Sequence, residues 1–107
     1  MVKIELHTIS RDGLYEANAV YIDGMVRVKK GSRINIHYGS GFKPSRPVKE
    51  RLDDHNLYDE KGILLKDVEF ETLSTAASFV AGRTSNGMLT WKTKDGKYVR
   101  ETLKSQN

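Results

Sequence analysis

The chain has 107 residues, of which 37% are hydrophobic and 30% are charged, and it contains no cysteine. This composition is typical of one soluble globular domain, and it excludes disulfide bonds, thiolate chemistry and cysteine zinc sites. The sequence has no apolar run long enough to cross a membrane, and its N-terminus lacks the pattern of a signal peptide. Since a cysteine-free domain fits a reducing compartment, we expect a cytoplasmic protein.

The net charge of +4 is distributed unevenly along the chain. Residues 1–49 and 72–107 have an excess of Lys and Arg, whereas residues 50–71 hold eight acidic residues against three basic ones. Two basic segments that flank an acidic one can form a face for an anionic polymer such as nucleic acid. The same pattern also fits an ordinary solvated surface.

The first third of the chain predicts antiparallel strands. Residues 3–9 alternate apolar and polar side chains, as a half-buried strand does, and residues 15–22 continue as a second strand. Asp23-Gly24 is a type I′ turn signal, because both central residues of that turn need a positive φ. Residues 25–31 then return as a third strand with its basic side chains facing outward.

The middle of the chain is less regular. Residues 33–36 predict a short strand, and residues 37–47 are punctuated by glycine and proline, which predicts a flexible loop. A helix is expected from Pro47 to about residue 57, because proline is favoured in a first helical turn and an apolar stripe follows it. Residues 63–65 predict a further short strand.

The sequence offers no catalytic or metal-binding constellation. Asp53, Asp54 and His55 are adjacent on the predicted helix, so their side chains point in different directions and do not converge on one ion. The other two histidines, His7 and His37, lack the spacing of a known metal motif. We therefore predict that the protein is not an enzyme and that it uses no cofactor or metal.

The stretch from Phe70 to Trp91 has the best-specified local structure. Thr72 is a suitable N-cap, and Gly82 stands where a left-handed C-cap belongs. Apolar residues recur between these caps with helical spacing, at Leu73, Ala76, Ala77 and Val80. The pattern predicts a short helix that packs closely on the sheet.

A hairpin is predicted after this helix. Asn86-Gly87 is a tight turn signal, and residues 88–93 alternate as a strand with Leu89 and Trp91 on one face. Asp95-Gly96 signals another turn, after which residues 98–100 are expected to pair back. We therefore predict one small α+β domain over residues 1–107, mostly antiparallel β-hairpins with two short helices packed on the sheet.

The stretch also resembles a known family. Its signature reads Phe70, Thr72, Ser74, Ala76, Ala77, Gly82-Arg83, Asn86-Gly87 and Trp91. In this it resembles the restriction-enzyme adenine-methylase-associated (RAMA) domain, and a related bacterial domain of unknown function often found C-terminal to GIY-YIG nuclease domains. The resemblance is densest over residues 68–101. Leu73 and Met88 replace a proline and a tryptophan that the family usually has at those positions.

The resemblance implies a role near DNA restriction or modification, and the charge pattern fits it. We predict a non-catalytic module that binds duplex DNA, with modified DNA as one form of the ligand and a nuclease or methyltransferase as a partner. The candidate contacts are basic or polar residues in two segments: Arg27, Lys29, Lys30, Arg33, Arg83, Ser85, Asn86, Lys92 and Lys94. For Arg83 and Asn86, the alternative is that they only hold the turn. A protein-interaction module remains the other functional class, with Tyr38 and Phe42 as its exposed apolar patch.

Overall fold

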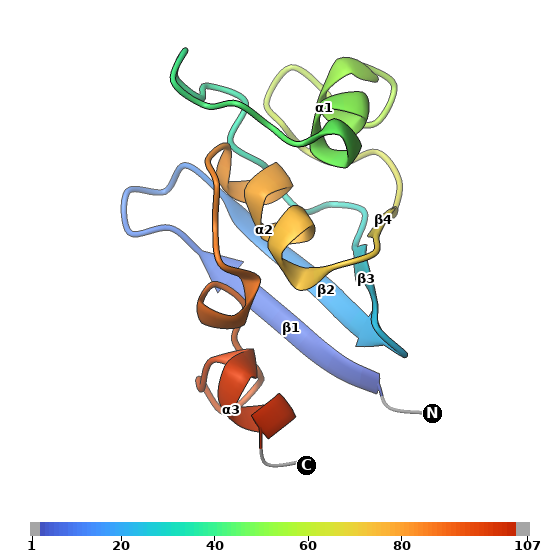
Figure 1. Cartoon of the computed structure of the whole chain (residues 1–107). Helices are drawn as coiled ribbons and strands as arrows, with labels where there is room; N and C mark the ends of the chain where they lie inside the picture. Colours follow the sequence, from blue (N-terminus) through green and yellow to red (C-terminus); the bar gives the residue numbers. More distant parts are fainter. Residues whose placement is uncertain (1–2, 105–107) are drawn as a thin grey trace.

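The computed structural model describes residues 3–104, and its centre is a four-stranded antiparallel sheet (Figure 1). The strands are β1 (Lys3–Ile9), β2 (Glu16–Ile22), β3 (Met25–Val28) and β4 (Val68–Phe70), in the order β1-β2-β3-β4. The type I′ turn predicted between β2 and β3 is confirmed, because Asp23 and Gly24 both have a positive φ. The α+β prediction is also confirmed.

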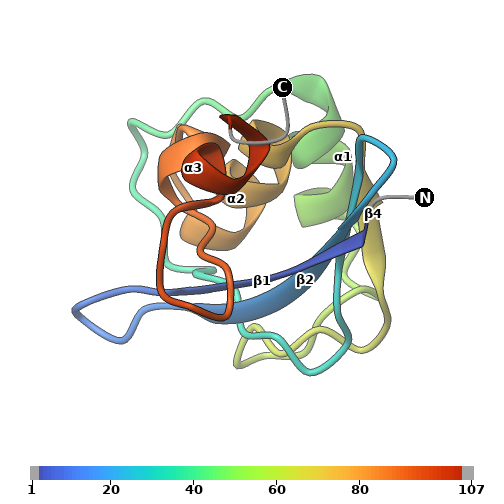
Figure 2. The same ribbon diagram turned by 90° about the horizontal axis from the view of Figure 1, so that it is seen from below.

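The helices cover one face of this sheet (Figures 1 and 2). They are α1 (Arg46–Asp53), α2 (Leu73–Ala81), the 3₁₀ turn η1 (Gly87–Leu89) and α3 (Val99–Lys104). Strand side chains alternate as predicted: Val26 and Val28 are buried beneath the helices, whereas Arg27 projects from the open face. The sheet therefore has one dry face and one face exposed to solvent.

Helix α2 packs closely on the sheet, as predicted. The Thr72 side chain accepts a hydrogen bond from the Thr75 N–H at 3.1 Å, and Gly82 ends the helix with a φ of 70°. Phe79 on this helix packs against Phe70 of β4, with 5.1 Å between the ring centroids. Trp91 is fully buried, and its indole Nε1 donates to the Leu73 carbonyl at 3.1 Å. Trp91 thus anchors the C-terminal segment to the start of α2.

The turn predicted at Asp95-Gly96 is confirmed, because the Thr93 N–H donates to the Lys97 carbonyl at 2.8 Å and Lys92 pairs back with Tyr98. The strand predicted over residues 88–93 is wrong. The Asn86 side chain accepts a hydrogen bond from the Met88 N–H, which starts the turn η1 instead of a strand. Leu89 is consequently 45% exposed while Trp91 is buried, so the two do not share a face. Lys92 forms isolated β-bridges with both His7 and Tyr98. Helix α3 then begins at Val99.

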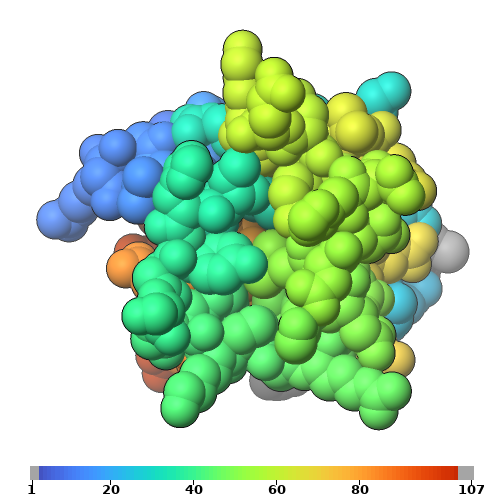
Figure 3. Space-filling model, turned by 90° about the horizontal axis from the view of Figure 1, so that it is seen from above, coloured from blue at the N-terminus to red at the C-terminus, as the bar shows by residue number. Residues whose placement is uncertain are grey.

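Other boundaries also differ from the predictions. Residues 33–36 and 63–65 make only isolated bridges, and the three-residue strand β4 has no sequence signal. Helix α1 begins at Arg46 within the predicted loop and ends at Asp53, because the Asp54 side chain accepts the Asn56 N–H in a turn. Figure 3 shows the segment around α1 covering one end of the molecule, with the β1–β2 connection protruding beside it.

Candidate nucleic-acid interface

The predicted basic residues fall in three places. Arg27, Lys29 and Lys94 project from the open face of the sheet, where they lie among carboxylates. Arg33 lies between β2 and the segment after Gly62, and its guanidinium donates to the Gly13 carbonyl at 2.6 Å. Arg83 lies on the loop after α2, away from the open sheet face. The structure therefore does not gather the predicted contacts into one continuous patch.

The lysines on the open sheet face are partly neutralised by Glu5. Its carboxylate lies 3.0 Å from the Lys94 ammonium and 3.8 Å from that of Lys29. The hydrogen bond from Lys94, followed by the charges of Lys94 and Lys29, lowers the pKa of Glu5 from its ordinary value. These three side chains and Lys92 line a shallow hollow of about 240 Å³.

The remaining basic residues of the hairpin are held in local contacts. Arg27 forms an ion pair with Glu69 on the neighbouring strand, at 3.4 Å. Lys30 is exposed, and its backbone N–H donates to the Asp67 carboxylate at 2.8 Å. Such exposed ion pairs contribute little stability, so they leave the cations accessible to a stronger anionic ligand.

Ser85 and Asn86 are engaged within the loop itself. The Ser85 hydroxyl donates to the Arg83 carbonyl at 3.0 Å, and its N–H donates to the Ser78 hydroxyl. The Asn86 side chain accepts from the Met88 N–H at 3.0 Å. Both side chains thus shape the loop that presents Arg83.

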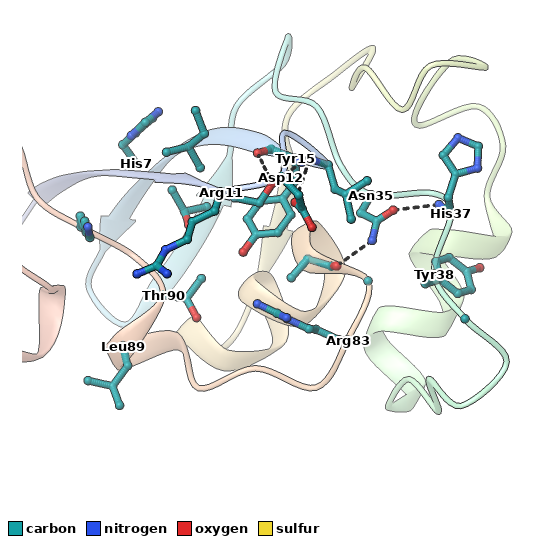
Figure 4. A pocket seen from close by; sticks show the side chains of 18 of the residues that line it. His7, Arg11, Asp12, Tyr15, Asn35, His37, Tyr38, Arg83, Leu89 and Thr90 are labelled. Atoms are coloured by element: carbon teal, nitrogen blue, oxygen red, sulfur yellow. Dashed lines mark hydrogen bonds between the residues drawn. The ribbon is translucent and has the colours of Figure 1, made fainter.

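Arg83 stands at the rim of a cleft of about 720 Å³ (Figure 4). The cleft lies where four segments meet: the β1–β2 connection, the segment from Asn35 to Gly39, the end of α2, and the residues around Thr90. In Figure 4, Arg11 and Arg83 extend from opposite segments toward the same space, while His7 and His37 point away from it. Two guanidinium groups therefore converge on one hollow.

The floor of the cleft is polar and uncharged. It is formed by Thr8, Tyr15 and Asn35, whose side chains are all nearly buried. The Asn35 amide is fixed in place, because its Nδ2 donates to the Ala81 carbonyl and its Oδ1 accepts from the His37 N–H. Asn35 thereby ties the end of α2 to the segment that carries Tyr38.

The hydroxyl groups of Thr8 and Tyr15 have no hydrogen-bond partner among residues 3–104. In the same residues, no buried polar side-chain atom lacks a partner. These two oxygens are therefore not fully shielded from solvent, and both residues line the cleft. Water or a ligand must satisfy them, because an unpaired hydroxyl shielded from both costs free energy.

The charge at the rim is positive on balance. Arg11, Arg83 and Lys92 line the cleft, and Asp12 is the only acidic residue among its lining. The Asp12 carboxylate accepts from the Leu14 N–H at 3.3 Å. A hydrogen bond with Ser10, this backbone contact and the Arg83 charge lower the pKa of Asp12 from its ordinary value. Asp12 is thus an ionised part of its own turn, beside the two arginines.

Gly82 determines how Arg83 reaches the cleft. Its left-handed backbone ends α2, and a Cβ at this position would lie 3.0 Å from atoms of both Asn35 and Tyr38. The chain therefore passes tightly behind the Asn35 amide and then turns Arg83 outward. Thr90, on the opposite side of the cleft, is held by a hydrogen bond from its hydroxyl to the Asn86 carbonyl.

A family model described as a domain of unknown function, DUF4357, matches residues 8–103. The chain belongs to the DUF4357 family. No curated protein and no solved structure matches this chain. The match says nothing of a relationship to the RAMA domain, which stays a prediction.

Sequence reasoning identified only part of the cleft of this DUF4357 domain. It selected Arg83 and Lys92, which line the cleft, but it missed Arg11, Tyr15 and Asn35. Arg11 lies in the connection between the first two predicted strands and Tyr15 at the start of the second, and neither position carries a local signal of function. The family signature Gly82-Arg83 was the one pattern that pointed to this place.

Two further properties bear on function. Within residues 3–104, no group of three or more His, Asp or Glu side chains is placed to hold a metal ion. None of the helices in that part of the chain is long and apolar enough to cross a membrane.

Proposed function

We propose that this DUF4357 domain is a non-catalytic module that binds duplex DNA in the cytoplasm, with a nuclease or methyltransferase as its partner. The observation that carries the proposal is the convergence of Arg11 and Arg83 over one cleft with a single acidic residue in its lining. Arginine forks match the geometry of phosphate oxygens and account for much of the affinity of DNA-binding proteins. The resemblance to the RAMA domain supports a restriction or modification setting.

The open sheet face carries a second, separate group of basic side chains beside the cleft. The shallow hollow beside β1 shares His7 and Lys92 with the cleft, so the two adjoin across the His7–Lys92 bridge. Lys29 and Lys94 can therefore contact a phosphate backbone whose neighbouring phosphates lie at the Arg83 rim. In this proposal, the backbone contacts position the domain and carry no sequence information.

Titration of a labelled duplex at several salt concentrations tests the proposal. The affinity should fall with salt, with a log–log slope of about −0.9 for each phosphate neutralised. The same titration with an adenine-methylated duplex tests whether modified DNA is preferred. Absence of binding to both duplexes at low salt would overturn the proposal.

The variant Arg83→Ala should weaken duplex binding by about tenfold, the effect of losing one charge-assisted contact. Its melting temperature should change little, because the Arg83 side chain makes no hydrogen bond or ion pair within residues 3–104 and its charge acts only on the exposed Asp12 carboxylate. The matched control is Arg46→Ala, which removes an arginine that is 90% exposed on α1 and lies outside the cleft. If both variants bind the duplex with the same affinity, Arg83 is not part of the interface.

A protein partner is the second candidate. Tyr38 is 39% exposed and packs edge-on against Phe42, with 5.3 Å between the ring centroids, which gives a small aromatic surface next to the cleft. A domain of this class would capture one specific protein and ignore DNA. The salt titration separates the two classes, since only the DNA module binds the duplex.

A further inference from the structure

We infer that the cleft receives a single unpaired nucleotide, with its phosphate between Arg11 and Arg83 and its base against the hydroxyls of the floor. This inference rests on the proposed function and makes its ligand more specific. It follows from the size of the cleft, from the separation of charged and uncharged groups within it, and from the hydrogen bonds that hold its walls.

The shape favours a group that leaves the double helix. A cleft of about 720 Å³ falls within the range of pockets that enclose one small organic molecule. The paired bases of a duplex stay stacked within it, so an intact duplex can reach the rim but not the floor. A nucleotide that is already unpaired enters such a pocket at the lowest cost, because no base pair has to be broken.

The chemistry of the cleft changes from rim to floor. The rim has the guanidinium groups of Arg11 and Arg83, which suit a phosphate. At the floor lie the nearly buried residues Thr8 and Tyr15, whose hydroxyls have no hydrogen-bond partner within residues 3–104, and hydroxyls can both donate and accept. Bases present neutral donors and acceptors of this kind on their edges. A nucleotide combines both types of group in one molecule, whereas an inorganic anion would leave the floor unsatisfied.

Hydrogen bonds hold two walls of the cleft in place without a ligand. Asn35 links the end of α2 to the His37 backbone through two hydrogen bonds, at 3.1 and 2.9 Å. On the opposite wall, the Ser10 hydroxyl accepts the Tyr15 N–H at 3.1 Å and so fixes the turn that carries Arg11. A preformed site avoids the cost of ordering its walls on binding.

Three DNA ligands of equal length test the inference: a perfect duplex, the same duplex with one bulged nucleotide, and that duplex with an abasic site at the bulge. The bulged duplex should bind about tenfold more tightly than the perfect one, the difference expected from two additional hydrogen bonds to the base. The abasic bulge bends the helix and keeps the phosphate but offers no base, so it should lose this advantage.

The variant Tyr15→Phe connects the preference to the cleft. It removes one unpartnered hydroxyl and keeps the buried ring, so the fold should be retained, and the ratio of bulge to duplex affinity should fall about threefold or more. Thr8→Val provides the same test from the neighbouring strand if Tyr15→Phe is unstable. The control Tyr21→Phe removes a hydroxyl that lines neither hollow and should leave the ratio unchanged.

Each outcome is decisive. If perfect and bulged duplexes bind equally, or if the abasic bulge binds as well as the bulged base, the inference is wrong while the proposed function stands. A preference that survives both Tyr15→Phe and Thr8→Val also contradicts it. If no DNA binds at low salt, the proposed function itself has failed.

Discussion

Position 87 needs glycine because a side chain would not fit there, and not because its backbone has a positive φ. Its φ is not in the left-handed region, yet a Cβ at this position would lie 2.2 Å from the Leu73 carbonyl carbon and 2.5 Å from the Ser74 nitrogen. The loop passes this close because the Gly87 N–H donates to the Ser74 hydroxyl and Trp91 donates to the Leu73 carbonyl. The Asn-Gly pair therefore marks a point of contact with α2.

We expect Gly87→Ala to lower the free energy of unfolding by about 2–3 kcal/mol, because the methyl group would push the loop away from backbone atoms that cannot move independently. Denaturant unfolding measures the change. The control Gly39→Ala adds the same methyl group where no atom lies within 4 Å, so it should alter stability by about 0.5 kcal/mol or less. If the two variants are equally stable, the structure accommodates a methyl group at position 87 without a loss in the free energy of unfolding.

At the scale of elements, α2 could be predicted almost to the residue because both of its ends are determined locally. The Thr72 cap and the Gly82 C-cap each act within four residues along the chain. By contrast, β4 has only three residues, and its partner β3 lies more than 35 residues earlier in the chain, so no local pattern reveals it. Residues 88–93 alternate like a strand, but local hydrogen bonds to the Asn86 side chain and the Gly87 carbonyl turn the backbone instead.

The candidate site could likewise be predicted only where a local pattern determines it. Arg83 was found because it follows a C-cap in a recognisable signature. Thr8, Tyr15 and Asn35 come from distant segments, and their polar groups meet only when the sheet and α2 are assembled. A sequence pattern does not indicate which hydroxyl will lack a partner, because that depends on the packing of all four segments.

Replacing the cap by Thr72→Ala should lower the free energy of unfolding by about 1 kcal/mol, since the Thr75 N–H would lose its acceptor. Thermal unfolding followed by circular dichroism measures the loss. Thr84→Ala is the matched control, because Thr84 is exposed and its side chain makes no hydrogen bond within residues 3–104. A loss of the same size in both variants would mean that the cap contributes nothing specific.

On the scale of the whole molecule, Glu5 moderates the positive charge of the open sheet face. The pKa of Glu5 is lowered by the hydrogen bond from Lys94 and by the charges of Lys94 and Lys29, so the carboxylate stays ionised at neutral pH. A group with a lowered folded-state pKa stabilises the fold above its unfolded pKa, and this contribution is lost as the pH falls through the folded pKa. Near neutral pH, only a substitution removes its charge.

We therefore expect Glu5→Gln to raise duplex affinity several-fold at low salt and to steepen the salt dependence, because Lys29 and Lys94 lose their competing carboxylate. The gain should vanish at high salt, where exposed charges are screened. Glu60→Gln produces the same change in net charge at an exposed position that lines neither hollow. If the duplex affinity rises equally in both variants, net charge alone explains the effect and the sheet face is not a contact surface.

The bridge between His7 and Lys92 has a consequence for the order in which the domain is completed during synthesis. Strand β1 is at the edge of the sheet, and within residues 3–104 its free side is paired only at this bridge, by two backbone hydrogen bonds of 2.8 Å. A nascent chain can pair β1 with β2 early, but this edge stays open until residue 92 has left the ribosome. Trp91 and Val99, both fully buried, are supplied at the same late stage. Because open strand edges promote aggregation, a chain that stops before Val99 should need a chaperone that the finished domain does not.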